Sequence, residues 1–65
     1  MNESKKIEAN YKAERLIVLF GNVKKAIDYQ KNIVKSLNVE QYPYNLNTYT
    51  LYLLERFDKE KEREN

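Results

Sequence analysis

The chain has 65 residues, no cysteine and no histidine, and carries 12 basic against 10 acidic residues. Disulfides and the usual zinc ligands are therefore excluded, so a core this small depends on helix packing or self-association for stability. The longest fully apolar run, from Leu16 to Phe20, is far shorter than the roughly 20 residues of a membrane span, and the N-terminus has no signal-peptide pattern.

Residues 4–20 are expected to form the first helix, because alanine, lysine and glutamate predominate up to the apolar run. One apolar side consists of Ile7, Tyr11 and Val18, at spacings of four and seven. A second and broader apolar side is formed by Ala9, Ala13, Leu16, Ile17 and Phe20. A helix that is apolar on two sides is normally buried from two directions. A short buried strand over 16–20 is the alternative, since five apolar residues do not separate the two structures.

Gly21 and Asn22 mark the boundary between this helix and a second one over residues 22–37. Glycine commonly ends a helix and asparagine commonly caps the start of the next. The apolar face of the second helix has the spacing of an α-helix, and it comprises Val23, Ala26, Ile27, Gln30, Ile33, Val34 and Leu37. The two helices are therefore expected to fold back on each other.

Residues 38–46 are expected to form a connection, and residues 47–63 a third helix capped by Asn45 or Asn47. Its core face is predicted to consist of Leu46, Tyr49, Thr50, Leu53, Leu54 and Phe57. The segment 48–52 also has strong strand propensity, so a strand there is the alternative. The sequence predicts a single all-α domain, a helical hairpin plus a third helix. This small three-helix bundle is expected to be completed by homodimerisation, because a third helix covers only one side of the first.

No pattern in the sequence indicates an enzyme. Ser4 and Ser36 have no histidine to activate them, and one glycine cannot form a phosphate-binding loop. The carboxylates alternate with lysines on faces predicted to be solvated. We therefore expect no catalytic residue, no cofactor and no metal site.

Binding is the remaining class of function, and two surfaces are candidates. Aromatic and apolar residues outside the predicted core are expected to contact a protein partner or a second copy: Tyr11, Val18, Phe20, Tyr49, Leu51 and Tyr52. A row of lysines opposite the apolar face of the second helix could instead contact a polyanion: Lys24, Lys25, Lys31 and Lys35. Tyr42 and Tyr44 add to the tyrosines available for stacking on bases.

The preferred interpretation is a small regulatory protein that inhibits or tethers a protein partner by steric contact. A nucleic-acid-binding module is the first alternative, although Asp28 interrupts the lysine row and arginine, the usual reader of bases, is absent from it. A structural assembly subunit is the second. We expect a cytoplasmic location, because small secreted domains usually need disulfides. The composition suggests an A+T-rich microbial or mobile-element genome.

Overall fold

The computed structural model describes residues 2–40 and 43–64 and consists of three packed helices. They are α1 (Glu3–Phe20), α2 (Val23–Ser36) and α3 (Tyr44–Glu64). Within these residues there is no strand, so both the 16–20 segment and the 48–52 segment are helical. The prediction of an all-α three-helix fold is confirmed. Tyr42, with the conformation that Pro43 would impose on it, lies outside the described residues.

The boundary between α1 and α2 has the predicted chemistry. Gly21 adopts a left-handed conformation (φ 67°, ψ 11°), and its N–H donates to the Ile17 carbonyl at 2.7 Å. The side-chain oxygen of Asn22 accepts from the backbone N–H groups of Lys24 and Lys25 at 2.8 and 3.1 Å. Glycine tolerates the positive φ, and asparagine satisfies amides that the first helical turn leaves without partners. The chain therefore reverses direction within two residues.

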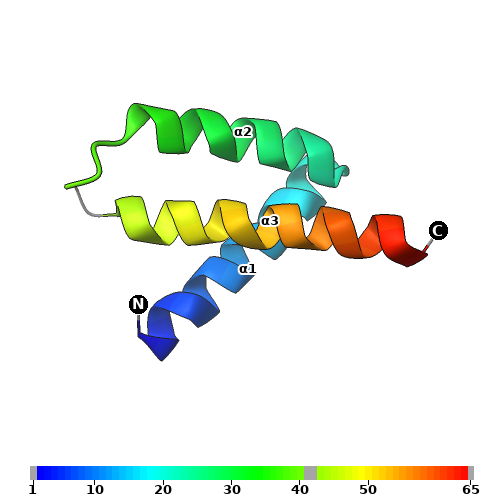
Figure 1. Ribbon diagram of the computed structural model, residues 1–65, viewed down its shortest axis with the longest axis horizontal. Helices are drawn as coiled ribbons and strands as arrows, with labels where there is room; N and C mark the ends of the chain where they lie inside the picture. Colours follow the sequence, from blue (N-terminus) through cyan, green and yellow to red (C-terminus); the bar gives the residue numbers. More distant parts are fainter. Residues whose placement is uncertain (1, 41–42, 65) are drawn as a thin grey trace.

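The helices form an antiparallel pair crossed by a third member. Figure 1 shows α2 and α3 side by side with α1 crossing them obliquely, so that the N-terminal half of α1 projects away from the pair. Ala9 and Ala13 of α1 and Ala26 of α2 are completely buried. Such small side chains allow helix backbones to approach closely, which suits the crossing. Among the described helices, none is both long and apolar enough to cross a bilayer.

The core is built from the faces that the sequence predicts for α2 and α3. Its buried apolar residues are Ala9, Ala13, Ala26, Ile27, Leu46, Leu53 and Leu54, and partly buried neighbours include Leu16, Ile17, Phe20, Val23, Tyr49, Leu51 and Phe57. The broader apolar side of α1 therefore faces the core. The narrower side, with Ile7, Tyr11 and Val18, is exposed.

The start of α3 differs from the expectation. The helix begins at Tyr44, so neither Asn45 nor Asn47 is its cap. Asn47 is buried inside the helix and accepts from the Gln30 side-chain amide at 2.9 Å, through both its side-chain oxygen and its backbone carbonyl. Its own side-chain amide donates to the Pro43 carbonyl at 3.2 Å. A buried polar partner on α2 is a tertiary feature, which asparagine's local preference for helix caps does not predict.

Candidate protein-binding surface

The outward side of α1 carries a row of large apolar side chains, which we call the outer stripe: Ile7, Tyr11 and Val18. Residues of an α-helix follow one another by about 100°, so these three fall within about 40° of one another. The buried residues Ala9 and Ala13 lie on the far side of the helix. Ile7, Tyr11 and Val18 are 66%, 61% and 79% exposed. The core therefore uses one apolar side of α1 and leaves the other in solvent.

Polar residues beside the outer stripe hold its central tyrosine and add charge. The Arg15 guanidinium lies over the Tyr11 ring, 5.9 Å from its centre. The Asn10 side-chain amide donates to the Glu14 carboxylate at 3.4 Å. A shallow groove runs along the flank, lined by Tyr11, Lys12, Arg15, Leu16 and Leu19, and Leu19 itself is strongly exposed. The surface thus combines apolar side chains with two cations, Lys12 and Arg15, and one anion, Glu14.

The predicted interface residues separate into two groups. Tyr11, Val18 and Tyr52 are exposed. The other three, Phe20, Tyr49 and Leu51, are partly buried against the core and therefore offer less surface to a partner.

The two aromatic residues of the second group have ring partners of their own. Phe20 packs on Tyr29 of α2, with ring centres 5.1 Å apart. Tyr49 stacks on Tyr52 at 5.7 Å with the rings inclined by 26°. Among the described residues, the exposed large apolar side chains that share one helix face are thus those of α1, Ile7, Tyr11 and Val18, with Glu14 between the last two.

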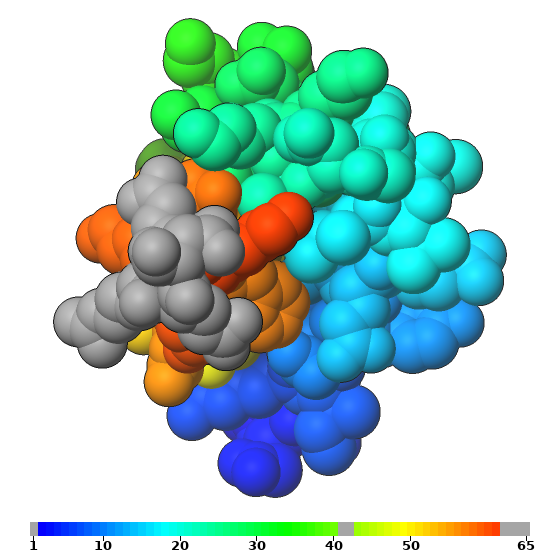
Figure 2. Space-filling model, turned by 90° about the vertical axis from the view of Figure 1, so that its right-hand side faces the viewer, coloured from blue at the N-terminus to red at the C-terminus, as the bar shows by residue number. Residues whose placement is uncertain are grey.

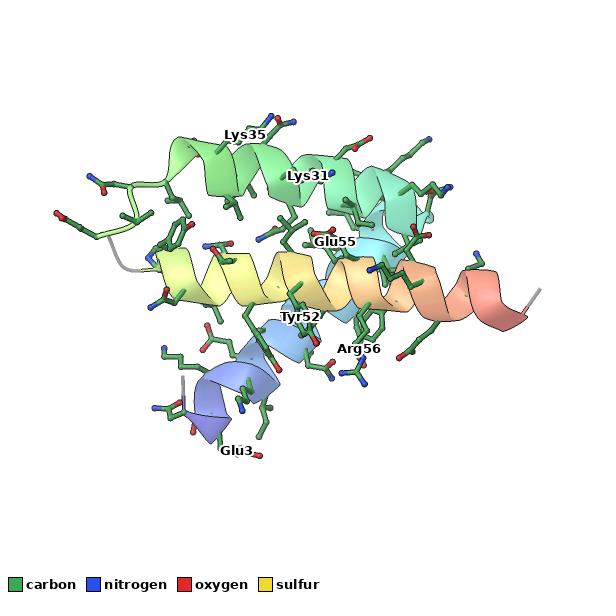
Figure 3. The ribbon with its side chains drawn as sticks, viewed as in Figure 1. Glu3, Lys31, Lys35, Tyr52, Glu55 and Arg56 are labelled. Carbon is green, nitrogen blue, oxygen red and sulfur yellow. The ribbon has the colours of Figure 1, made fainter. Side chains whose placement is uncertain are left out.

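The outward face of α3 is more polar. Its surface depression is lined by Thr48, Leu51, Tyr52, Glu55, Arg56, Lys59 and Glu60. Arg56 pairs with Glu60 at 3.3 Å. In Figure 3, Glu55 extends from α3 toward α2, whereas Tyr52 and Arg56 extend to the opposite side of α3. Tyr52, stacked on the partly buried Tyr49, therefore has mainly charged and polar neighbours on this outward face.

The lysine row of α2 is exposed but has acidic neighbours. Lys24, Lys25, Lys31 and Lys35 are all exposed, and Lys31 and Lys35 lie on α2 in Figure 3. One depression between α2 and α3 is lined by Lys24, Ile27, Asp28, Lys31, Glu55, Asp58 and Lys59. Three cationic and three anionic side chains therefore share this part of the surface. A phosphate backbone following the lysine row would meet carboxylates from α3, which sequence spacing on α2 alone does not predict.

Two residues of the α1 surface are absent from the predicted interface, Ile7 and Leu19. The signal for Ile7 was its spacing of four from Tyr11, which places both on one side of the helix. Leu19 belongs to a run of five apolar residues, in which the sequence does not show which members face the core. Among the described residues, no group of three acidic side chains is close enough to hold a metal ion.

Comparison with known proteins adds no relative. No protein-family model matches the chain, and neither a curated protein nor a solved structure is significantly similar to it.

Proposed function

We propose that this chain is a small cytoplasmic, non-enzymatic regulatory protein that acts by binding another protein through the outer stripe of α1. The observation that carries the proposal is the exposure of Ile7, Tyr11 and Val18 together on the side of α1 opposite the core, with the exposed Glu14 between Tyr11 and Val18. Isolated apolar residues are normal on protein surfaces, but a row of three on one helix face indicates an interaction site.

The shape of the surface suits a helical partner. Apolar residues in line along a helix can dock against the apolar face of another helix. Each then acts as an anchor, and successive anchors lie one or several turns apart. Tyr11 adds a hydroxyl and a rigid ring, which contribute contact area at low entropic cost. A chain of this size without catalytic residues would regulate by occupying its partner's surface or by tethering it.

The test uses two matched variants. Val18→Glu places a charge within the proposed interface, where an unpaired buried charge is costly. Val39→Glu makes the same change at a residue 67% exposed in the connection between α2 and α3. We expect partners cross-linked to the parent chain in its native cells to be lost with Val18→Glu and retained with Val39→Glu. Identical partners for both variants would contradict the proposal.

Nucleic-acid binding is the weaker candidate, because the lysine row borders Asp28, Glu55 and Asp58. If Lys24, Lys31 and Lys35 of a dimer all neutralised phosphates, the affinity for duplex DNA would fall with a log–log salt slope of about −5. We expect little binding at physiological salt. Replacing the three lysines with glutamate should leave the fold and the binding of protein partners unchanged. Sub-micromolar DNA or RNA binding in about 150 mM salt would instead favour the nucleic-acid function.

A further inference from the structure

We infer that the outer stripe of α1 pairs with the same stripe of a second copy, antiparallel, about a two-fold axis near the midpoint between Lys12 and Ala13. The inference rests on the proposed function, because it names an occupant for the same helix face. It is carried by three observations: the symmetric placement of Ile7 with Val18 and of Tyr11 with Glu14, the charge of Glu14, and the exposure of this side of α1 within the part of the chain that the structure describes.

The two ends of the outer stripe are placed symmetrically about this midpoint, and so are Tyr11 and the exposed Glu14 beside the stripe. Ile7 precedes it by as many residues as Val18 follows it, which is about 8 Å along the helix on either side. Tyr11 and Glu14 are likewise equidistant from it, at about 2 Å. In an antiparallel pair, each Ile7 therefore meets Val18 of the second copy, and each Tyr11 meets Glu14 of the second copy.

The charge pattern selects the antiparallel arrangement. Antiparallel pairing brings the Tyr11 hydroxyl to the Glu14 carboxylate, which accepts a charge-assisted hydrogen bond. Among the described residues of one chain, the hydrogen bond that this carboxylate accepts is a long one, from Asn10 at 3.4 Å. In a parallel two-fold pair every residue faces its own copy, so the two Glu14 carboxylates would repel each other. Antiparallel helices also place opposite ends of their dipoles together.

The fold leaves room for the second copy. The outer stripe points away from the core, and α2 and α3 pack on the other side of α1. Figure 2 shows α1, in blue to cyan, along one edge of the molecule, with α2 above it and α3 on the opposite side. The side of α1 that would face the second copy is therefore not the side that packs on α2 and α3. The 11 residues from Ile7 to Val18 make about three turns of a nearly straight α-helix, so both residues lie on the same side. The two stripes can therefore stay in contact along their length.

The size of the contact sets the strength of the dimer. The stripe spans three helical turns, about 16 Å, so its interface is smaller than the roughly 1,200–2,000 Å² of a stable complex. We therefore expect dimers that dissociate at micromolar concentrations. In such a dimer the outer stripe of α1 is covered by the second copy. Dissociation of the dimer exposes the stripe again, so that a different protein can bind it.

Cysteine cross-linking tests the orientation directly, because the chain contains no cysteine of its own. We expect an equimolar mixture of Ile7→Cys and Val18→Cys chains to form the mixed disulfide under mild oxidation. Ile7→Cys alone should not cross-link, because its two copies would lie about 16 Å apart, beyond the reach of a disulfide. Val39→Cys is the control for random collision. Efficient cross-linking of Ile7→Cys alone, or no cross-linking in the mixture beyond the control, would overturn the inference.

Sedimentation of the purified chain tests the dimer itself. We expect the parent chain and Val39→Glu to dimerise equally, and Val18→Glu to raise the dimer dissociation constant at least tenfold. Circular dichroism should show the same helix content in all three. A parent chain that stays monomeric at hundreds of micromolar, or a Val18→Glu chain that dimerises like the parent, would refute self-pairing.

The two proposals can fail separately. A monomeric parent chain whose cellular partners are still lost with Val18→Glu would overturn self-pairing and leave the proposed function intact. A dimer disrupted by Val18→Glu while cellular partners are retained would support self-pairing and refute binding of other proteins at this face.

Discussion

The buried contact between Gln30 and Asn47 offers the sharpest test of how α2 and α3 are held together. The Gln30 amide donates to two oxygens of Asn47, each at 2.9 Å, and both side chains are almost fully buried. Removing one partner leaves the other's polar group buried without its hydrogen bond, whereas replacing both with apolar side chains removes the problem. A double-mutant cycle with leucine at each position therefore measures the interaction energy between Gln30 and Asn47, apart from the energy of each residue's other contacts.

The expected loss of stability follows from the two hydrogen bonds and from the buried polar group that loses its partner. Gln30→Leu loses both bonds and leaves the Asn47 side-chain oxygen without this donor, so it should cost about 2 kcal/mol. Asn47→Leu also loses two bonds, the one that its side-chain oxygen accepts from Gln30 and the one that its amide donates to Pro43, so it should cost a similar amount, although the Gln30 amide keeps the backbone carbonyl of residue 47. The Pro43 carbonyl still accepts from the backbone N–H of residue 47 at 3.1 Å. The double variant should lie within about 1 kcal/mol of the parent chain.

Urea unfolding followed by circular dichroism measures these values, at a concentration low enough to keep every chain monomeric. Each single variant should also lower the melting temperature by about 8–16 °C for a domain of this size. A domain whose stability is only about 3–5 kcal/mol would lose much of it in either single variant. If the two costs simply add in the double variant, the hydrogen bonds do not couple the helices and the reasoning is wrong.

Four further substitutions can be checked by the same unfolding experiment. Ala13→Leu should cost about 1–3 kcal/mol, because Ala13 is fully buried and a larger side chain there overpacks the core. Gly21→Ala should cost about 1–2 kcal/mol because of the positive φ at this residue, since an added Cβ meets no atom within 4 Å. Asparagine adopts a positive φ more readily than alanine, so an equal cost for Gly21→Asn would contradict this explanation. Asn22→Ala should cost about 1 kcal/mol through two lost capping bonds. Thr48→Val should be neutral or stabilising by up to about 1 kcal/mol, because its buried hydroxyl has no hydrogen-bond partner among the described residues. A clear loss of stability would refute that.

Local chemistry in the sequence predicts three helices and the tight turn between the first two, but not the residue at which the third helix begins. Gly21 and Asn22 act through their own backbone conformation and hydrogen bonds, which need no distant contact. The face of α2 follows a spacing that only a helix brings together, so Ala26, Ile27 and Gln30 were assigned to the core correctly.

Tertiary structure decided the features that depend on which surfaces meet. The sequence shows two apolar sides on α1, but only the crossing of α1 over α2 and α3 buries Ala9 and Ala13 and leaves Ile7 and Val18 exposed. Asn47 is a good helix cap by local preference, yet burial beside Gln30 makes it a link between helices. Acidic residues of α3 reach the lysine row of α2 only in the folded chain. Spacing reports which residues share a face of one helix, whereas burial and charge balance depend on the neighbouring helix that packs there.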